Sequence, residues 1–111
     1  MALIIWKPRA IRQLNAIIDY GVPEFGMVAF NRLDKRIQEI IYRLEQFPES
    51  FPPEPLLINN YILFRSCILR KRHKIIYHYV KEKDTIYIDD ILVYGRGYIT
   101  PTLKGSNSIP F

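Results

Sequence analysis

The sequence predicts an α+β domain with the element order β-α-α-β-β-β, in which a helical hairpin packs on one face of a small, twisted, mostly antiparallel sheet. Three observations lead to this fold: a short apolar run near the N-terminus, two stretches with helical spacing of apolar residues, and three β-rich runs separated by polar turns. The chain has 111 residues, of which 49 % are hydrophobic. That length and composition suit one compact core, so we expect residues 1–111 to form a single domain.

The first half of the chain predicts one strand and two helices. The apolar run of residues 3–6 is stopped by Lys7-Pro8, and Pro8 suits the first turn of a helix. We expect that helix to end at Gly21 and Pro23, and a second helix to extend over residues 24–46. Apolar residues recur at intervals of three and four in both stretches: Ala10, Ile11, Leu14, Ile17 and Ile18 in the first, and Phe30, Leu33, Ile37, Ile40, Leu44 and Phe47 in the second. The tight link predicts an antiparallel helical hairpin that serves as scaffold.

A proline-rich connector separates the helices from the predicted sheet. Residues 47–55 hold four prolines, which cannot continue a helix. We interpret the connector's acidic residues, Glu49 and Glu54, as surface charge. Three β-rich runs follow, at residues 61–69, 74–80 and 85–94, joined by the turns 70–73 and 81–84. The pair Asp89-Asp90 interrupts the alternation of the last run, which points to a β-bulge; residues 102–111 show little pattern and fit a loose tail.

The net charge of +5 lies in the second half of the chain. Residues 1–55 carry seven Lys/Arg and seven Asp/Glu, whereas residues 56–111 carry nine Lys/Arg and four Asp/Glu. One cluster within ten residues has no acid: Arg65, Arg70, Lys71, Arg72 and Lys74. Localised positive charge predicts an anionic partner, although a solvated basic turn is an equally good reading.

Other classes of protein are disfavoured. Cys67 is the only cysteine, so the chain has neither an intramolecular disulfide framework nor a cysteine-based zinc site. No cluster has metal-ligand spacing and no glycine-rich loop follows a strand, so we expect neither a metal nor a cofactor. No apolar stretch approaches the roughly 20 residues of a membrane-spanning helix, and we expect a cytoplasmic protein that does not engage a membrane.

Several short patterns resemble the RelE/ParE superfamily of toxins from bacterial type II toxin–antitoxin systems. The opening helix resembles the family's in its Pro8-Arg9-Ala10 start and its apolar spacing, and Leu44 with Phe47-Pro48 resembles the end of the second helix. The strand pair of the family is matched by Phe64-Arg65-Ser66 and by residues 74–79, Lys-Ile-Ile-Tyr-His-Tyr. Its last strand and the basic residue beyond it are matched by residues 86–91 and Tyr94-Gly95-Arg96. In this order the patterns cover residues 2–98.

The resemblance implies a growth-arresting toxin that is neutralised by a small acidic antitoxin. RelE-like members cleave mRNA on the ribosome, whereas ParE-like members poison DNA gyrase. We favour ribosome-dependent mRNA cleavage by a metal-independent endoribonuclease, with gyrase inhibition as the alternative. A non-catalytic nucleic-acid-binding module or a degenerate toxin-like protein is a third reading. The oligomeric state is left open.

Candidate site residues follow from the resemblance and the basic cluster. Metal-free RNA cleavage needs a base, an acid and positive charge at the scissile phosphate. The catalytic candidates are Arg65, Lys74, Arg96, His73 and Tyr98. The candidates for nucleic-acid binding are Arg65, Arg70, Lys71, Arg72, Lys74 and Arg96.

Both sets come with structural alternatives. Neighbouring cations should keep His73 neutral. Two departures from the RelE pattern favour gyrase instead: Tyr98 follows Arg96 at too short a spacing, and Lys74 replaces an arginine that binds phosphate at two points. Arg65 is equally well read as an ion-pair partner of Asp89 or Asp90. His78 and the tyrosines at 77, 79 and 87 are read as sheet residues.

Overall fold

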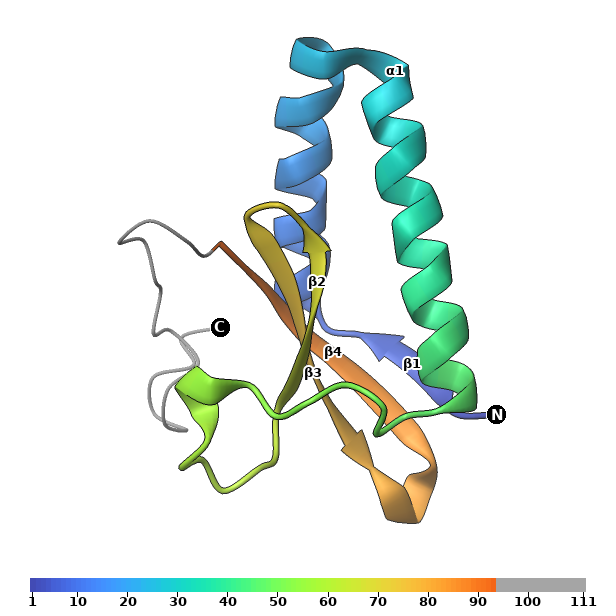
Figure 1. Cartoon of the computed structure of the whole chain (residues 1–111), viewed down its shortest axis with the longest axis vertical. Coiled ribbons are helices and arrows are strands. Elements are labelled where there is room, and N and C mark those ends of the chain that lie inside the picture. The colour runs from blue at the N-terminus through green and yellow to red at the C-terminus, as the bar shows by residue number, and fades with distance from the viewer. Residues whose placement is uncertain (94–111) are drawn as a thin grey trace.

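The computed structural model describes residues 1–93 and confirms the predicted α+β architecture (Figure 1). A four-stranded sheet has the strand order β1-β4-β3-β2, and β1 pairs parallel with β4 while the other two pairings are antiparallel. One face of the sheet is covered by a long helix that folds back on itself. The elements in chain order are β1 (Leu3–Trp6), α1 (Pro8–Gln46), η1 (Pro55–Leu57), β2 (Arg65–Arg70), β3 (His73–Val80), η2 (Lys81–Lys83) and β4 (Thr85–Val93).

The helical hairpin turns at Gly26, not at Gly21 and Pro23 as predicted. Gly21 and Pro23 both lie in the helical conformation, and only Gly26 departs from it, with φ of 82° and ψ of −179°. That backbone conformation is essentially restricted to glycine, because a Cβ atom would clash in it. Pro23 removes one backbone hydrogen bond near the end of the first half but does not end it. The first half therefore runs about one turn further than the sequence suggested.

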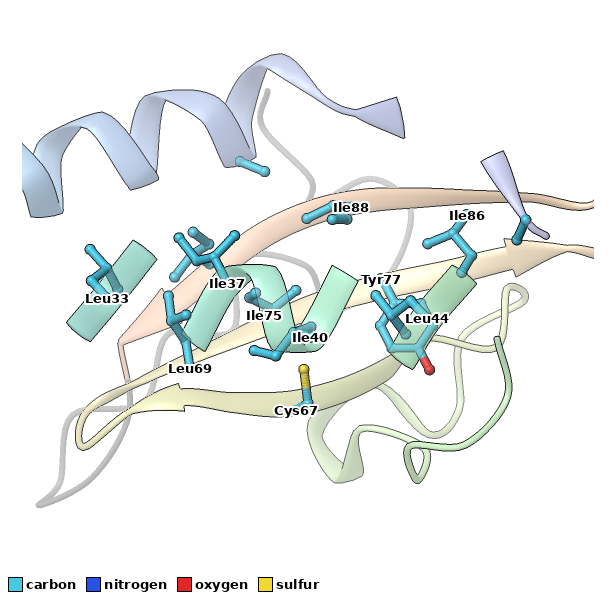
Figure 2. Close-up of a cluster of buried hydrophobic side chains, with 13 residues drawn as sticks. Leu33, Ile37, Ile40, Leu44, Cys67, Leu69, Ile75, Tyr77, Ile86 and Ile88 are labelled. Carbon is cyan, nitrogen blue, oxygen red and sulfur yellow. The ribbon is translucent and has the colours of Figure 1, made fainter. Parts of the chain in front are cut away.

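The main core fills the space between the sheet and α1. Figure 2 shows Leu33, Ile37, Ile40 and Leu44, from the second half of α1, lying over side chains of β2, β3 and β4. The strand residues in this cluster include Cys67, Leu69, Ile75, Tyr77, Ile86 and Ile88. The predicted spacing thus accounts for the buried residues of α1, but two positions included in it, Ile11 and Phe47, are 43 % and 64 % exposed. We call the face of the sheet under α1 the helix face, and the opposite one the second face.

The interruption at Asp89-Asp90 is a β-bulge, as predicted. Ile76 pairs with Asp90 while the next residue of β3, Tyr77, pairs with Ile88, so Asp89 is the extra residue of β4. Bulges break the alternation of side chains and redirect one of them. As a result both carboxylates are buried although they are neighbours in the strand.

The connector lies along the outer edge of the sheet, and it shortens the predicted strand 61–69. Strand β2 begins only at Arg65, and two backbone hydrogen bonds join its start to the connector: the Glu54 amide donates to the Phe64 carbonyl, and the Ser66 amide donates to the Pro52 carbonyl. Leu56 and Leu57, from η1, pack on the second face against Ile76 and Leu92. The second face therefore has a small apolar cluster of its own.

The turns of the sheet match the predicted ones closely. Arg70 pairs with His73, so the basic turn between β2 and β3 narrows to Lys71-Arg72. The polar turn at 81–84 contains η2, and the last strand ends at Val93. Tyr94, Arg96, Tyr98 and the predicted tail 102–111 lie outside the described residues.

Candidate functional site

The basic hairpin end gathers four of the candidate residues on one exposed part of the molecule. Arg70, Lys71 and Arg72 are exposed at the β2–β3 turn, and within residues 1–93 none of them forms an ion pair. His73, the first residue of β3, is half-buried beside them. Burial lowers the pKa of His73 below its ordinary 6.5, and Arg70 lowers it further. The imidazole is therefore neutral near pH 7, as the sequence predicted.

Arg65 is held inside the fold. Its Nη1 donates a hydrogen bond of 2.7 Å to the carbonyl oxygen of Phe51, which lies in the connector. The sequence reading that paired Arg65 with Asp89 or Asp90 is wrong, since these carboxylates have other cationic partners. Arg65 joins the start of β2 to the connector, and this contact occupies part of its guanidinium.

Lys74 forms an ion pair with a buried carboxylate. Its Nζ lies 2.6 Å from Oε1 of Glu54, whose side chain is 0 % exposed; the Lys74 side chain is 17 % exposed. The other oxygen of Glu54 accepts a hydrogen bond of 2.8 Å from the Leu56 amide and caps η1. Reading Glu54 as surface charge was therefore wrong. A signal was present in the sequence, because an acidic residue directly before proline suits the N-cap of a short helix.

The alternation of the strands places Arg65 and Lys74 on opposite faces of the sheet. Arg65 pairs with Tyr77, a core residue of the helix face, and shares that face. Lys74 precedes Ile75 of the same core and so points the other way, as does Ile76 in the second-face cluster. The two cations cannot meet at one phosphate without rearrangement of the sheet. His73 lies on the same face as Arg65, but it pairs with Arg70 at the opposite end of β2.

A second group of ionisable residues occupies the second face near β1. Asp89 shares the face of Tyr87, and its carboxylate lies 2.7 Å from Nδ1 of His78 and 3.7 Å from Nζ of Lys7. The His78 ring stacks on Tyr87, with centroids 5.2 Å apart, and meets the edge of Phe64. This arrangement confirms that His78 and Tyr87 are packing residues of the sheet. Its one chemical feature is that Asp89 fixes the orientation of the imidazole.

The neighbouring carboxylate, Asp90, is also paired. Its Oδ2 lies 2.9 Å from Nε of Arg9, at the start of α1, and its Oδ1 accepts from the Ile91 amide. Burial raises the pKa of Asp90 above its usual range, and Arg9 opposes that rise. The ion pairs of Asp89 and Asp90 thus join β4 to Lys7 and Arg9, at the start of α1. Sequence reasoning missed them because nothing in the local pattern shows which cation reaches the bulge.

The described residues do not converge on a nuclease centre. Arg65 and Lys74 have protein partners on different faces, the basic hairpin end is a third place, and Arg96 and Tyr98 lie outside the description. Tyr77 is fully buried and its hydroxyl donates to the Pro48 carbonyl, which gives it the packing role expected from the sequence. Among residues 1–93 no group of three or more His, Cys, Asp or Glu could hold a metal ion. In the same residues, no helix has the length and apolar character needed to span a bilayer.

Comparison with known proteins gives one family. The family model described as the ParE toxin of type II toxin–antitoxin systems, parDE, matches residues 4–95, which is most of the chain. No curated protein matches the sequence. The matched region contains α1, β2, β3 and β4 in full, and all of β1 except Leu3.

Proposed function

This chain belongs to the ParE toxin family of type II toxin–antitoxin systems, and we propose that it arrests growth by binding DNA gyrase, not by cutting mRNA. Membership of the family implies an antitoxin as the cognate partner. We propose that this antitoxin is small and acidic, because the toxin carries a net charge of +5. A segment that becomes ordered on binding would suit such a partner.

The position of Arg65 and Lys74 carries the choice of gyrase. Cleavage of RNA through its 2′-hydroxyl requires cations that meet at the scissile phosphate. Here the two cations of the strand pair lie on opposite faces and bind Phe51 and Glu54. Inhibition by binding makes no such demand, since it needs only a surface that fits the target.

Ribosome-dependent mRNA cleavage is the second candidate, and the basic hairpin end favours it. Arg70, Lys71 and Arg72 could contact RNA phosphates, and a neutral His73 beside them could accept a proton. In this second candidate, mRNA cleavage takes place at the β2–β3 turn, and Arg65 and Lys74 have structural roles only.

The experiment expresses the toxin alone in bacteria under a tight promoter. DNA damage response, supercoiling of a reporter plasmid and mRNA 5′ ends are measured within minutes of induction. The wild type is compared with Lys71→Ala, His73→Gln and the antitoxin-bound complex. A purified-component assay then measures supercoiling by gyrase in the presence of the toxin.

The two candidates give different results. Growth arrest with DNA damage, lost supercoiling and unchanged mRNA ends supports action on gyrase. New mRNA ends at ribosome-occupied codons, lost in His73→Gln, would overturn the gyrase proposal in favour of cleavage at the hairpin end. Normal growth with folded toxin would overturn both.

A further inference from the structure

The helical hairpin extends beyond the end of the sheet and leaves a hollow that no described residue fills. Figure 1 shows the two halves of α1 running past the β2–β3 turn. The hollow, which we call the tip wedge, has a volume of about 360 Å³. Its walls include Ile17, Tyr20 and Phe25 from α1 and Arg70, His73 and Val93 from the ends of the strands.

Two aromatic side chains stand at the mouth of the tip wedge. Tyr20 and Phe25 are 68 % and 58 % exposed, and their rings meet edge to face with centroids 6.3 Å apart. Met27 and Val28, just beyond the turn of the hairpin, are also more than half exposed. Further along α1 the apolar face is covered by strands, but here the sheet has ended. Exposed large apolar side chains gathered at one end of a molecule are typical of protein–protein interfaces.

Positive charge borders the same hollow. Arg70 lines the tip wedge, and Lys71 and Arg72 follow it in the β2–β3 turn. Within residues 1–93 none of the three has an acidic partner. In addition, Nδ1 of His73 is buried in the wall without a hydrogen-bond partner in the described part of the chain. An arginine next to exposed aromatic rings is the composition of binding hot spots.

We infer that the tip wedge is the surface through which this toxin binds its protein target, gyrase, by accepting a large apolar side chain that is flanked by an acidic residue. The apolar side chain enters the hollow beside the contacting rings of Tyr20 and Phe25, and the carboxylate contacts Arg70. The inference rests on the proposed function and adds the location of binding and the chemistry of the complementary segment. Nucleic acid fits less well, because Arg70 lines the hollow on one side while most of the remaining described wall is apolar.

The cation Arg70 and the two aromatic rings of the tip wedge should affect different rate constants. A charge at the rim of an interface acts mainly on association, whereas a buried anchor acts on dissociation. We therefore expect Arg70→Glu to slow association with purified gyrase about tenfold and to reduce its salt dependence. Phe25→Ala and Tyr20→Ala should each speed dissociation roughly tenfold, in the range of single interface truncations.

Matched controls are available on the same helix. Tyr42 is 67 % exposed, nearly the same as Tyr20, but lies near the other end of the hairpin. Arg32 is an exposed arginine on the second half of α1 and does not line the tip wedge. Tyr42→Ala and Arg32→Glu should bind gyrase like the wild type. Thermal unfolding of every variant confirms that the fold is kept.

Binding is measured by surface-immobilised toxin with gyrase in solution, alongside inhibition of supercoiling. Weaker gyrase binding and weaker inhibition of supercoiling in Arg70→Glu, Tyr20→Ala and Phe25→Ala, with the two controls unchanged, support the inference. Wild-type inhibition that persists in all three wedge variants would overturn the inference and leave the proposed function standing. Absence of any binding by the folded wild type would overturn both.

Discussion

Replacing Lys74 by methionine should strongly destabilise the fold, because it leaves the carboxylate of Glu54 buried without its cation. Glu54 is 0 % exposed and lies 2.6 Å from the ammonium group. Breaking a buried ion pair from one side typically costs about 3–5 kcal/mol. Glu54 keeps its hydrogen bond to the Leu56 amide, so we expect the lower end, about 3 kcal/mol.

Urea unfolding followed by tyrosine and tryptophan fluorescence measures this loss. With an m-value of about 2 kcal/mol per molar urea, 3 kcal/mol moves the midpoint down by roughly 1.5 M. The reverse change, Glu54→Gln, should cost less, because the Lys74 side chain is 17 % exposed and its charge can reach water. The exposed Lys71→Met is the control and should change stability by less than about 0.5 kcal/mol.

The double variant Glu54→Gln/Lys74→Met separates a structural from a catalytic Lys74. Removing both charges should recover part of the loss, with a coupling energy of roughly 1–3 kcal/mol. Under the gyrase proposal this folded double variant still arrests growth. The reasoning fails if Lys74→Met alone unfolds within about 0.5 kcal/mol of the wild type, since the buried carboxylate would then not need its cation.

Three further changes test other parts of the structure. Gly26→Ala should destabilise the fold by about 1–3 kcal/mol, because Gly26 has a φ of 82°. Gly21→Ala should stabilise the fold by about 0.5–1 kcal/mol, because Gly21 is helical and has open space around its Cβ position. Calorimetry of both variants checks this, and a more stable Gly26→Ala than Gly21→Ala would contradict the position of the turn. The unfolding free energy should fall as the pH drops below 6.5, because His73 takes up a proton in the unfolded chain more readily than in the folded protein, where its pKa is lowered. The fall should be smaller in His73→Gln. An equal fall in that variant would show that His73 is not its cause. Burial raises the pKa of Cys67 to about 12, so iodoacetamide at pH 8 should label the thiol only after unfolding, and rapid labelling of native protein would show that this part of the core is open.

The fold was predictable because its main signals are local. Helical spacing in α1, alternation in β3 and the break at Asp89-Asp90 each depend on a few consecutive residues, and each corresponds to an element of the structure. The turn of the helical hairpin was misplaced because the sequence contains two sets of helix breakers. Only the backbone angles show that Gly26 makes the turn while Pro23 remains helical. The predicted strand 61–69 was also too long at its start, since β2 begins only at Arg65, where its backbone bonds to the connector.

The candidate site was less predictable because charge clustering in sequence is not clustering in space. Arg65, Arg70 and Lys74 fall within ten residues, yet two of them neutralise or bridge groups of the connector and only Arg70 borders an exposed hollow. Strand alternation alone would have separated Arg65 from Lys74, had the pairing of β2 and β3 been known. The partners that hold them, a main-chain carbonyl of the connector and the buried Glu54, carry no local signal that names a distant cation. The cations between residues 65 and 74 therefore divide into two kinds: Arg65 and Lys74 join the connector to the sheet, whereas the cations at the β2–β3 turn remain available to a partner.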